Sequence, residues 1–286
     1  MPTVTRLLLL SLSCFVFTQC ASEAPPADET TEWQVLFDGS SLDGWDTFLG
    51  PEWGPGTTWA TIQDQPAKGV NVDSFGVFTI VEIDGGPVLR ISGEYWGGIS
   101  TQEVFDNYHL QLEFKWGEKR WYPRADDKRD SGLLYHAGGE HGAGSGFWLR
   151  SQEFQIQEGD CGDHWSVATA VINVPARMMA DSTYRFDPEG DLVEFGRDTP
   201  AGSRCIKYPD AEKPTGEWNT LDLYCFGGTA WHVVNGVLTM KLENSREIID
   251  GITRPLTKGR LQLQSEAAEV FYRNIRIQPL TEAPAL

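Results

Sequence analysis

Hydrophobic and polar residues alternate along most of the chain after Trp33, in short stretches separated by glycine, proline and asparagine. The clearest stretch is 108–116 (YHLQLEFKW), in which Leu110, Leu112 and Phe114 share one face. A period of two is typical of a β-strand with one buried face. Further strands are expected at 76–82, 88–92, 99–102, 131–136, 153–157, 217–226, 259–263 and 270–277.

Residues 230–242 predict a β-hairpin around Asn235-Gly236, because this pair accepts the positive φ angles of a type I′ turn. No stretch places apolar residues at helical spacing between caps, and no internal repeat suggests a propeller or solenoid. Residues 178–215 are polar and proline-rich, which suggests a long loop. Together these features predict an all-β fold, a two-sheet antiparallel β-sandwich or jelly roll.

The first residues have the composition of an export signal. In 1–19, Arg6 precedes an apolar stretch that is too short to span a bilayer. Cys20 stands where a lipoprotein carries its lipidated cysteine, and 20–32 are acidic and proline-rich, as expected of a flexible tether. We therefore expect an exported lipoprotein on the cell envelope, in the periplasm or at the outer membrane, with a single β-sandwich domain at 33–281. Ordinary secretion is the alternative.

The charge balance excludes one large class of partners. Lys and Arg number 23 and Asp and Glu number 41, which gives a formal net charge of −18. Nucleic acid demands clustered basic residues, so no nucleic-acid partner is expected, and membrane contact is expected only through the lipid anchor. Cys161, Cys205 and Cys225 remain in the domain, where one disulfide and one buried thiol would suit an oxidising compartment.

The polar residues of 153–157 indicate a carbohydrate site. In an extended strand Glu153, Gln155 and Gln157 share one face, whereas Phe154 and Ile156 point to the other face and should be buried. Carboxyl groups on strands that line a groove are typical of glycosidic bond cleavage. We therefore expect Glu153 to face a concave groove, with a solvated polar edge strand as the simpler alternative.

Other residues with suitable chemistry lie near this strand in the sequence. The candidate bases are Glu153 and His136, and the candidate acids are Glu158 and His164. The candidate substrate-binding residues are Gln155, Gln157, Asp130, His141, Asp163, Trp148 and Trp165. Trp96 could also stack on a sugar, whereas Trp45, Trp59 and Trp218 are expected in the core.

The glycine-rich stretch 137–146 is expected to form a flexible loop over the cleft. His136, Glu140 and His141 could bind a divalent metal, although the spacing of these residues is a weak signal. No cofactor is required by any motif. A divalent ion could nevertheless polarise a substrate ketone.

Six short motifs occur in order along the domain. They are 33–45 (WQVLFDGSSLDGW), 130–132 (DSG), 153–158 (EFQIQE), 216–219 (GEWN), 232–236 (HVVNG) and 271–275 (FYRNI). Together they resemble the 3-keto-disaccharide hydrolase family, which implies a concanavalin-A-like lectin/glucanase sandwich. Two positions depart from the family pattern, since Asp130 replaces an Asn and Tyr135-His136 stands where an Arg is frequent.

The strand at 153–158 also resembles the Glu-x-Asp-x-x-Glu strand of laminarinase-type glucanases, with Gln155 in the Asp position. An amide cannot raise the pKa of a neighbouring carboxyl by its charge, so a conventional retaining mechanism is disfavoured. The family resemblance implies cleavage of 3-keto-glycosides, in which the ketone acidifies the C2 proton for removal by a base. A non-catalytic sugar-binding lipoprotein and a conventional glucanase are the alternatives, and each would take an oligosaccharide or glycoside as its partner.

Overall fold

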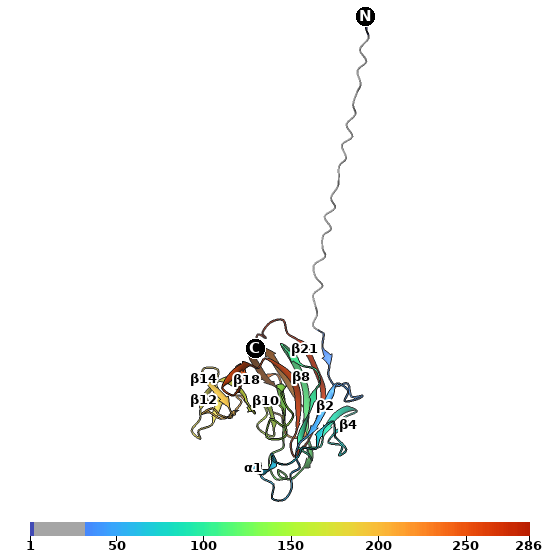
Figure 1. Ribbon diagram of the computed structural model, residues 1–286, viewed down its shortest axis with the longest axis vertical. Coiled ribbons are helices and arrows are strands. Elements are labelled where there is room, and N and C mark those ends of the chain that lie inside the picture. Colours follow the sequence, from blue (N-terminus) through green and yellow to red (C-terminus); the bar gives the residue numbers. More distant parts are fainter. Residues whose placement is uncertain (3–31) are drawn as a thin grey trace. The chain divides into compact units, whose positions relative to one another are not determined.

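The computed structural model describes residues 1–2 and 32–286 (Figure 1). The proposed export signal, Cys20 and almost all of the tether lie outside the described residues, so the lipid anchor stays a prediction. The described residues 32–286 cluster as one unit. Within the described part, none of the helical structure is long and apolar enough to span a membrane.

Two antiparallel sheets pack face to face, as the alternating pattern predicted. The path of the larger sheet runs β13 (Tyr184–Phe186), β12 (Ala170–Met178), β18 (Val237–Ile249), β17 (Thr229–Val234), β16 (Asn219–Phe226), β8 (Tyr108–Arg120), β21 (Ala268–Pro279), β5 (Gly86–Ile91) and β4 (Phe78–Ile83). At its margins β1 (Gln34–Val35) pairs with β21, β14 (Asp191–Gly196) with β12 and β19 (Ile252–Pro255) with β18. The predicted all-β sandwich is confirmed.

The smaller sheet carries the strands that matter for the site. Its path runs β15 (Arg204–Cys205), β11 (His164–Val167), β10 (Arg150–Gln157), β9 (Asp130–Gly138), β20 (Lys258–Ser265), β6 (Gly97–Thr101), β2 (Trp45–Leu49) and β3 (Gly69–Val70), and β7 (Phe105–Asp106) pairs with β20. Between β2 and β3 the chain forms α1 (Trp59–Ile62), the only helix in the described residues and one that the sequence pattern did not predict.

The core lies between the two sheets. Leu110, Leu112 and Phe114 of β8 are buried there, as are Phe154 and Ile156 of β10, so the predicted alternation in both strands is confirmed. Burying side chains of this size contributes about 1.5–3 kcal/mol each relative to leaving them exposed. The core therefore fixes the register of β10 and with it the direction of the polar residues between its apolar ones.

The predicted hairpin is confirmed between β17 and β18. Asn235 has φ 50° and Gly236 has φ 80°, the two positive values that a type I′ turn requires. By contrast, residues 178–215 are not the predicted loop, because they contain β13, β14 and β15. The prolines that suggested irregular backbone lie between these short strands or after β15. At these positions proline removes no ladder hydrogen bond.

Two further expectations about the core are wrong. Cys161, Cys205 and Cys225 are all free and buried, so none of them forms the expected disulfide, and each packs as a small apolar side chain. Trp45 is buried as expected, but Trp218 is only partly buried, and Trp59 is half exposed on α1, because the turn of helix lifts its ring out of the sandwich.

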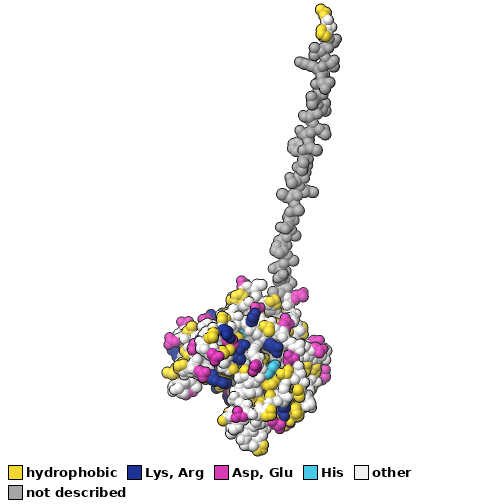
Figure 2. Space-filling view, in the orientation of Figure 1, with side chains coloured by type: hydrophobic (Ala, Val, Ile, Leu, Met, Phe, Trp, Pro, Cys, Tyr) yellow, Lys and Arg dark blue, Asp and Glu magenta, His cyan; other side chains and the backbone are white. Residues whose placement is uncertain are grey.

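On the face shown in Figure 2, acidic and basic side chains are interspersed.

Candidate functional site

A cavity of about 310 Å³ opens over the polar face of β9, β10, β11 and β20. Its lining consists of Trp59, Arg124, Asp130, Trp148, Glu153, Gln155, Gln157, Trp165, Gln264 and Glu266. The structure therefore brings together six of the residues singled out from the sequence, namely Asp130, Trp148, Glu153, Gln155, Gln157 and Trp165.

Strand pairing places these side chains beside one another. Glu153 of β10 is directly opposite Trp165 of β11, and Gln157 is opposite Asp130 of β9. Directly paired residues in an antiparallel ladder point to the same face, so all four side chains project into the cavity. The loop from β9 to β10 brings Trp148 to the same cavity, where its indole Nε1 donates a hydrogen bond to the carbonyl oxygen of Gly97 (3.1 Å).

Gly132 provides the space in which the Glu153 carboxyl lies. A Cβ atom at this position would stand 2.2 Å from Glu153 Oε1 and 2.5 Å from Gln264 Oε1. Because glycine has no side chain, both groups can rest against the backbone of β9. The Asp-Ser-Gly motif therefore contributes a carboxyl at its first position and an empty space at its third.

Two of the three carboxyl groups in the cavity share one guanidinium group. Arg124 Nη1 donates to Asp130 Oδ2 and to Glu266 Oε1, the latter at 2.6 Å. Gln157 Nε2 also donates to Asp130 Oδ2, at 2.5 Å. The third carboxyl, that of Glu153, has the Gln264 amide as its hydrogen-bonding neighbour and no counter-charge of its own among the described residues.

The excess of carboxyl groups over the single guanidinium group shifts the pKa values of Glu153 and Asp130. Burial raises the pKa of Glu153 well above its usual value, and the negative charges of Asp130 and Glu266 raise it further. Burial also raises the pKa of Asp130 to about 6, although Arg124 opposes this shift. Both shifts favour the protonated form of Glu153, whereas the pKa of Asp130 lies at about 6.

Arg124, Gln264, Glu266 and Trp59 were missed by the sequence interpretation. Arg124 lies in a stretch of mixed charge that resembles a solvated loop. Gln264 and Glu266 did have a detectable signal, because Gln262, Gln264 and Glu266 repeat the polar period of two that singled out β10. Two polar faces of this kind in one chain would suggest that both strands line the same cavity.

His136 does not lie near Glu153 in the cavity, contrary to expectation. Its ring lies between the sheets, with its centroid 5.2 Å from that of Tyr135 and 6.4 Å from that of Tyr108. The reason is a bulge: His136 has φ 51°, and the pairing of β9 shifts register here against both neighbours, so Tyr135 and His136 point inward in succession. Burial lowers the pKa of His136 to about 3.

His164 is also directed away from the cavity. It is paired with Phe154, so it shares the inner face of the sheet, where its Nε2 hydrogen-bonds with Ser166 Oγ at 3.1 Å. Burial lowers the pKa of His164 to about 3, which leaves the ring neutral. The adjacent Asp163 is buried in an ion pair with Arg204 (2.5 Å), an arrangement that anchors β15.

Glu158 and His141 likewise lie outside the lining of the cavity. Glu158 is paired with Arg129 at 3.0 Å, beyond the end of β10. His141 stacks on Phe48 with ring centroids 5.0 Å apart. The suggested metal ligands His136 and His141 are therefore not brought together, and the described residues contain no group of three or more potential ligands that could hold a metal ion.

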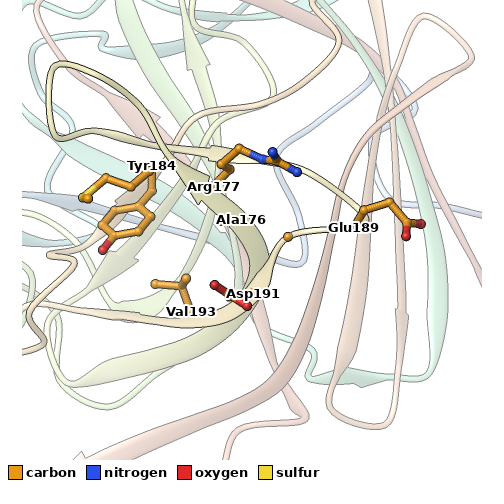
Figure 3. A pocket seen from close by; sticks show the side chains of 8 residues that line it. Ala176, Arg177, Tyr184, Glu189, Asp191 and Val193 are labelled. Carbon is orange, nitrogen blue, oxygen red and sulfur yellow. The ribbon is translucent and has the colours of Figure 1, made fainter.

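A larger hollow of about 430 Å³ lies beside β12, β13 and β14 (Figure 3). In this view Tyr184 lies on one side and Glu189 on the other, with the Glu189 carboxylate pointing outward. Arg177 is already paired with Asp187 at 2.8 Å. The polar side chains that line this hollow do not converge on a common point. The cavity over β10 is therefore the better candidate active site.

Among solved structures, two candidate glycosyl hydrolases from Parabacteroides distasonis ATCC 8503 are similar to this chain. The first is 19% identical with TM-score 0.46, covering 87% of this chain and 100% of that chain; the second is 18% identical with TM-score 0.47, covering 87% and 94%. A Bacillus licheniformis β-glucanase is 8% identical with TM-score 0.39, covering 87% and 97%.

No curated protein matches the chain. The sequence model of the 3-keto-alpha-glucoside-1,2-lyase-like domain, however, matches residues 32–278. This match confirms the family resemblance that the ordered motifs predicted, and it indicates a carbohydrate-active enzyme of the glycoside-cleaving kind. Because the match spans nearly the whole described domain, the protein belongs to the 3-keto-alpha-glucoside-1,2-lyase-like family.

Proposed function

We propose that the protein cleaves the glycosidic bond of 3-keto-glycosides by acid–base chemistry in the cavity over β10. Family membership supports a glycoside-cleaving enzyme. The observation that carries the proposal is the buried Glu153 carboxyl, which lines the same cavity as Asp130 and Glu266, with Arg124 as the shared counter-charge of those two. Burial raises the pKa of Glu153 well above its usual value, and a carboxyl of this kind next to one with a pKa of about 6 suits proton transfer in both directions.

The ketone makes an elimination route available. A base removes the proton from C2, which the C3 ketone acidifies, and the electrons of that C–H bond form a double bond between C1 and C2. The bond between C1 and the leaving oxygen breaks, and this oxygen takes a proton from the general acid. Water then adds across the double bond, with hydroxide joining C1 and a proton joining C2. The net reaction is hydrolysis, and it needs no covalent glycosyl-enzyme intermediate.

We assign Glu153, which the sequence suggested as a base, to the role of acid, and Asp130, which it suggested as a substrate-binding residue, to the role of base. Asp130 Oδ2 is occupied by Arg124 and Gln157, whereas Oδ1 is buried without a hydrogen-bond partner among the described residues. A base with a pKa of about 6 is ionised at neutral pH and still accepts a proton readily. The amides of Gln155 and Gln264 line the same cavity, and we assign them the binding of sugar hydroxyls.

The two alternatives fit the cavity less well. A laminarinase-type glucanase carries its paired carboxylates on one strand, and that pattern is absent here, because Gln155 is an amide and Glu158 lies outside the cavity. A sugar-binding protein needs amides and aromatic rings, and it gains nothing from three buried carboxyls around Arg124. Burying charge is costly, so this cluster suggests catalysis.

The proposal is tested with a 3-keto-disaccharide and the same disaccharide without the ketone, followed by product analysis. We expect cleavage of the keto form alone, and deuterium at C2 of the early product when the reaction runs in heavy water. Glu153→Gln should reduce kcat by about 10²–10⁴-fold, because a positioned acid contributes that much. Glu158→Gln is the matched control and should retain activity. Rapid cleavage of the unoxidised disaccharide would contradict the proposal.

A further inference from the structure

The residues that line the candidate active site differ widely in solvent exposure. The buried ones mark the floor of the cavity and the exposed ones mark its mouth. Glu153 and Gln155 are 6% and 5% exposed and form the floor. Trp148 is 9% exposed, whereas Trp59 is 50% exposed. Trp59 therefore lies at the mouth of the cavity, and the reactive carboxyl lies at its closed end.

Trp59 is held in place by other aromatic rings despite its exposure. Its ring centroid lies 5.0 Å from that of Trp53 at an interplanar angle of 80°, and 5.4 Å from that of Trp96 at 60°. Trp96 is fully buried, as is Ile62 at the other end of α1. Tilted and edge-to-face contacts of this kind fix the orientation of a ring, and half of the Trp59 side chain stays exposed.

The exposed half of the Trp59 side chain is not used in packing. Its position suits the part of a substrate that remains outside the closed end of the cavity. If C1 of the sugar lies beside Glu153 at the floor, the bond to the leaving group points toward the mouth, where Trp59 is the most exposed lining residue. The cavity of about 310 Å³ is also at the small end of ligand sites, which suits one terminal sugar unit.

We propose that Trp59 binds the leaving group, so that the enzyme removes a terminal keto-sugar from leaving groups that present a flat, apolar face to the indole. This inference rests on the proposed function. Two kinds of leaving group have such a face, an aromatic ring and a second pyranose ring. A small aliphatic leaving group such as a methyl group has none.

The experiment compares three 3-keto-glucosides that share the sugar and differ in the leaving group, which is phenyl, glucosyl or methyl. For each substrate the measured quantity is the ratio of kcat/KM between the wild-type enzyme and Trp59→Ala, so that intrinsic reactivity cancels. We expect a loss of about 10-fold for the phenyl or the glucosyl substrate, or for both, because stacking and burial of the ring are lost. The methyl glycoside should change by less than about 2-fold, since only binding at the rim is removed.

Two further variants separate binding at the rim from a structural role. Trp59→Phe keeps an aromatic face and should recover most of the lost kcat/KM. Tyr208→Ala removes another exposed aromatic residue, outside the cavity, and should leave all three ratios near one. Equal losses on all three substrates, or no loss on any, would overturn the inference.

Failure of the proposed function gives a different result. In that case the wild-type protein cleaves none of the three glycosides, and calorimetry then measures their affinities for wild type and Trp59→Ala. A selective loss of affinity for the phenyl or glucosyl compound upholds the role of Trp59 in binding, and an equal affinity for all three in both proteins refutes it.

Discussion

Replacing Gly132 by alanine should disable the site while leaving the fold largely intact. The new Cβ would stand 2.2 Å from Glu153 Oε1 and 2.5 Å from Gln264 Oε1, whereas ordinary contacts begin at 3.4 Å. The Glu153 carboxyl must therefore move by roughly 1 Å, a displacement that costs about 10²-fold in rate when it affects a reacting group. Overpacking at one position should also lower the free energy of unfolding by about 1–3 kcal/mol.

The assay is kcat on a 3-keto-disaccharide, together with urea unfolding of the same preparations. Gly86→Ala is the matched control, because a Cβ there meets no atom within 4 Å. It should keep wild-type activity and change stability by less than about 0.5 kcal/mol. If Gly132→Ala lost stability but kept its kcat, the position of the Glu153 carboxyl would not matter for the reaction, and the site assignment would be refuted.

The remaining predictions concern pH and cellular location. Because burial raises the pKa of Asp130 to about 6, kcat/KM should fall as the pH drops below about 6, and Asp130→Asn should abolish turnover over the whole profile. Burial lowers the pKa of His164 to about 3, so the unfolded state binds a proton that the folded state does not, and stability falls as pH drops below about 6.5. His164→Gln should remove about 2 kcal/mol of the loss in unfolding free energy between pH 7.5 and 5, measured by urea unfolding, whereas His141→Gln should remove less. Cys20→Ser should move the protein from the membrane to the soluble fraction, and equal partitioning of both forms would contradict the anchor.

Local patterns in the sequence determined the parts of this protein that depend on neighbouring residues. The alternation of β10 predicted that Phe154 and Ile156 are buried and that Glu153 and Gln155 point the other way, because side chains in a strand alternate with a period of two. The turn at Asn235-Gly236 was equally local, since the positive φ angles depend on those two residues alone. The ordered motifs indicated the family without any knowledge of contacts.

The candidate active site depended on contacts that only the tertiary structure forms. Arg124 and Glu266 are 142 positions apart, yet the packing of β9 beside β20 joins both to Asp130, and no pattern along the chain states that pairing. His136 shows the same limit at short range, because one bulge reversed the alternation that the sequence predicted. Periodicity sets the direction of side chains within a strand, but sheet register and bulges depend on the whole core, so they decide which residues meet.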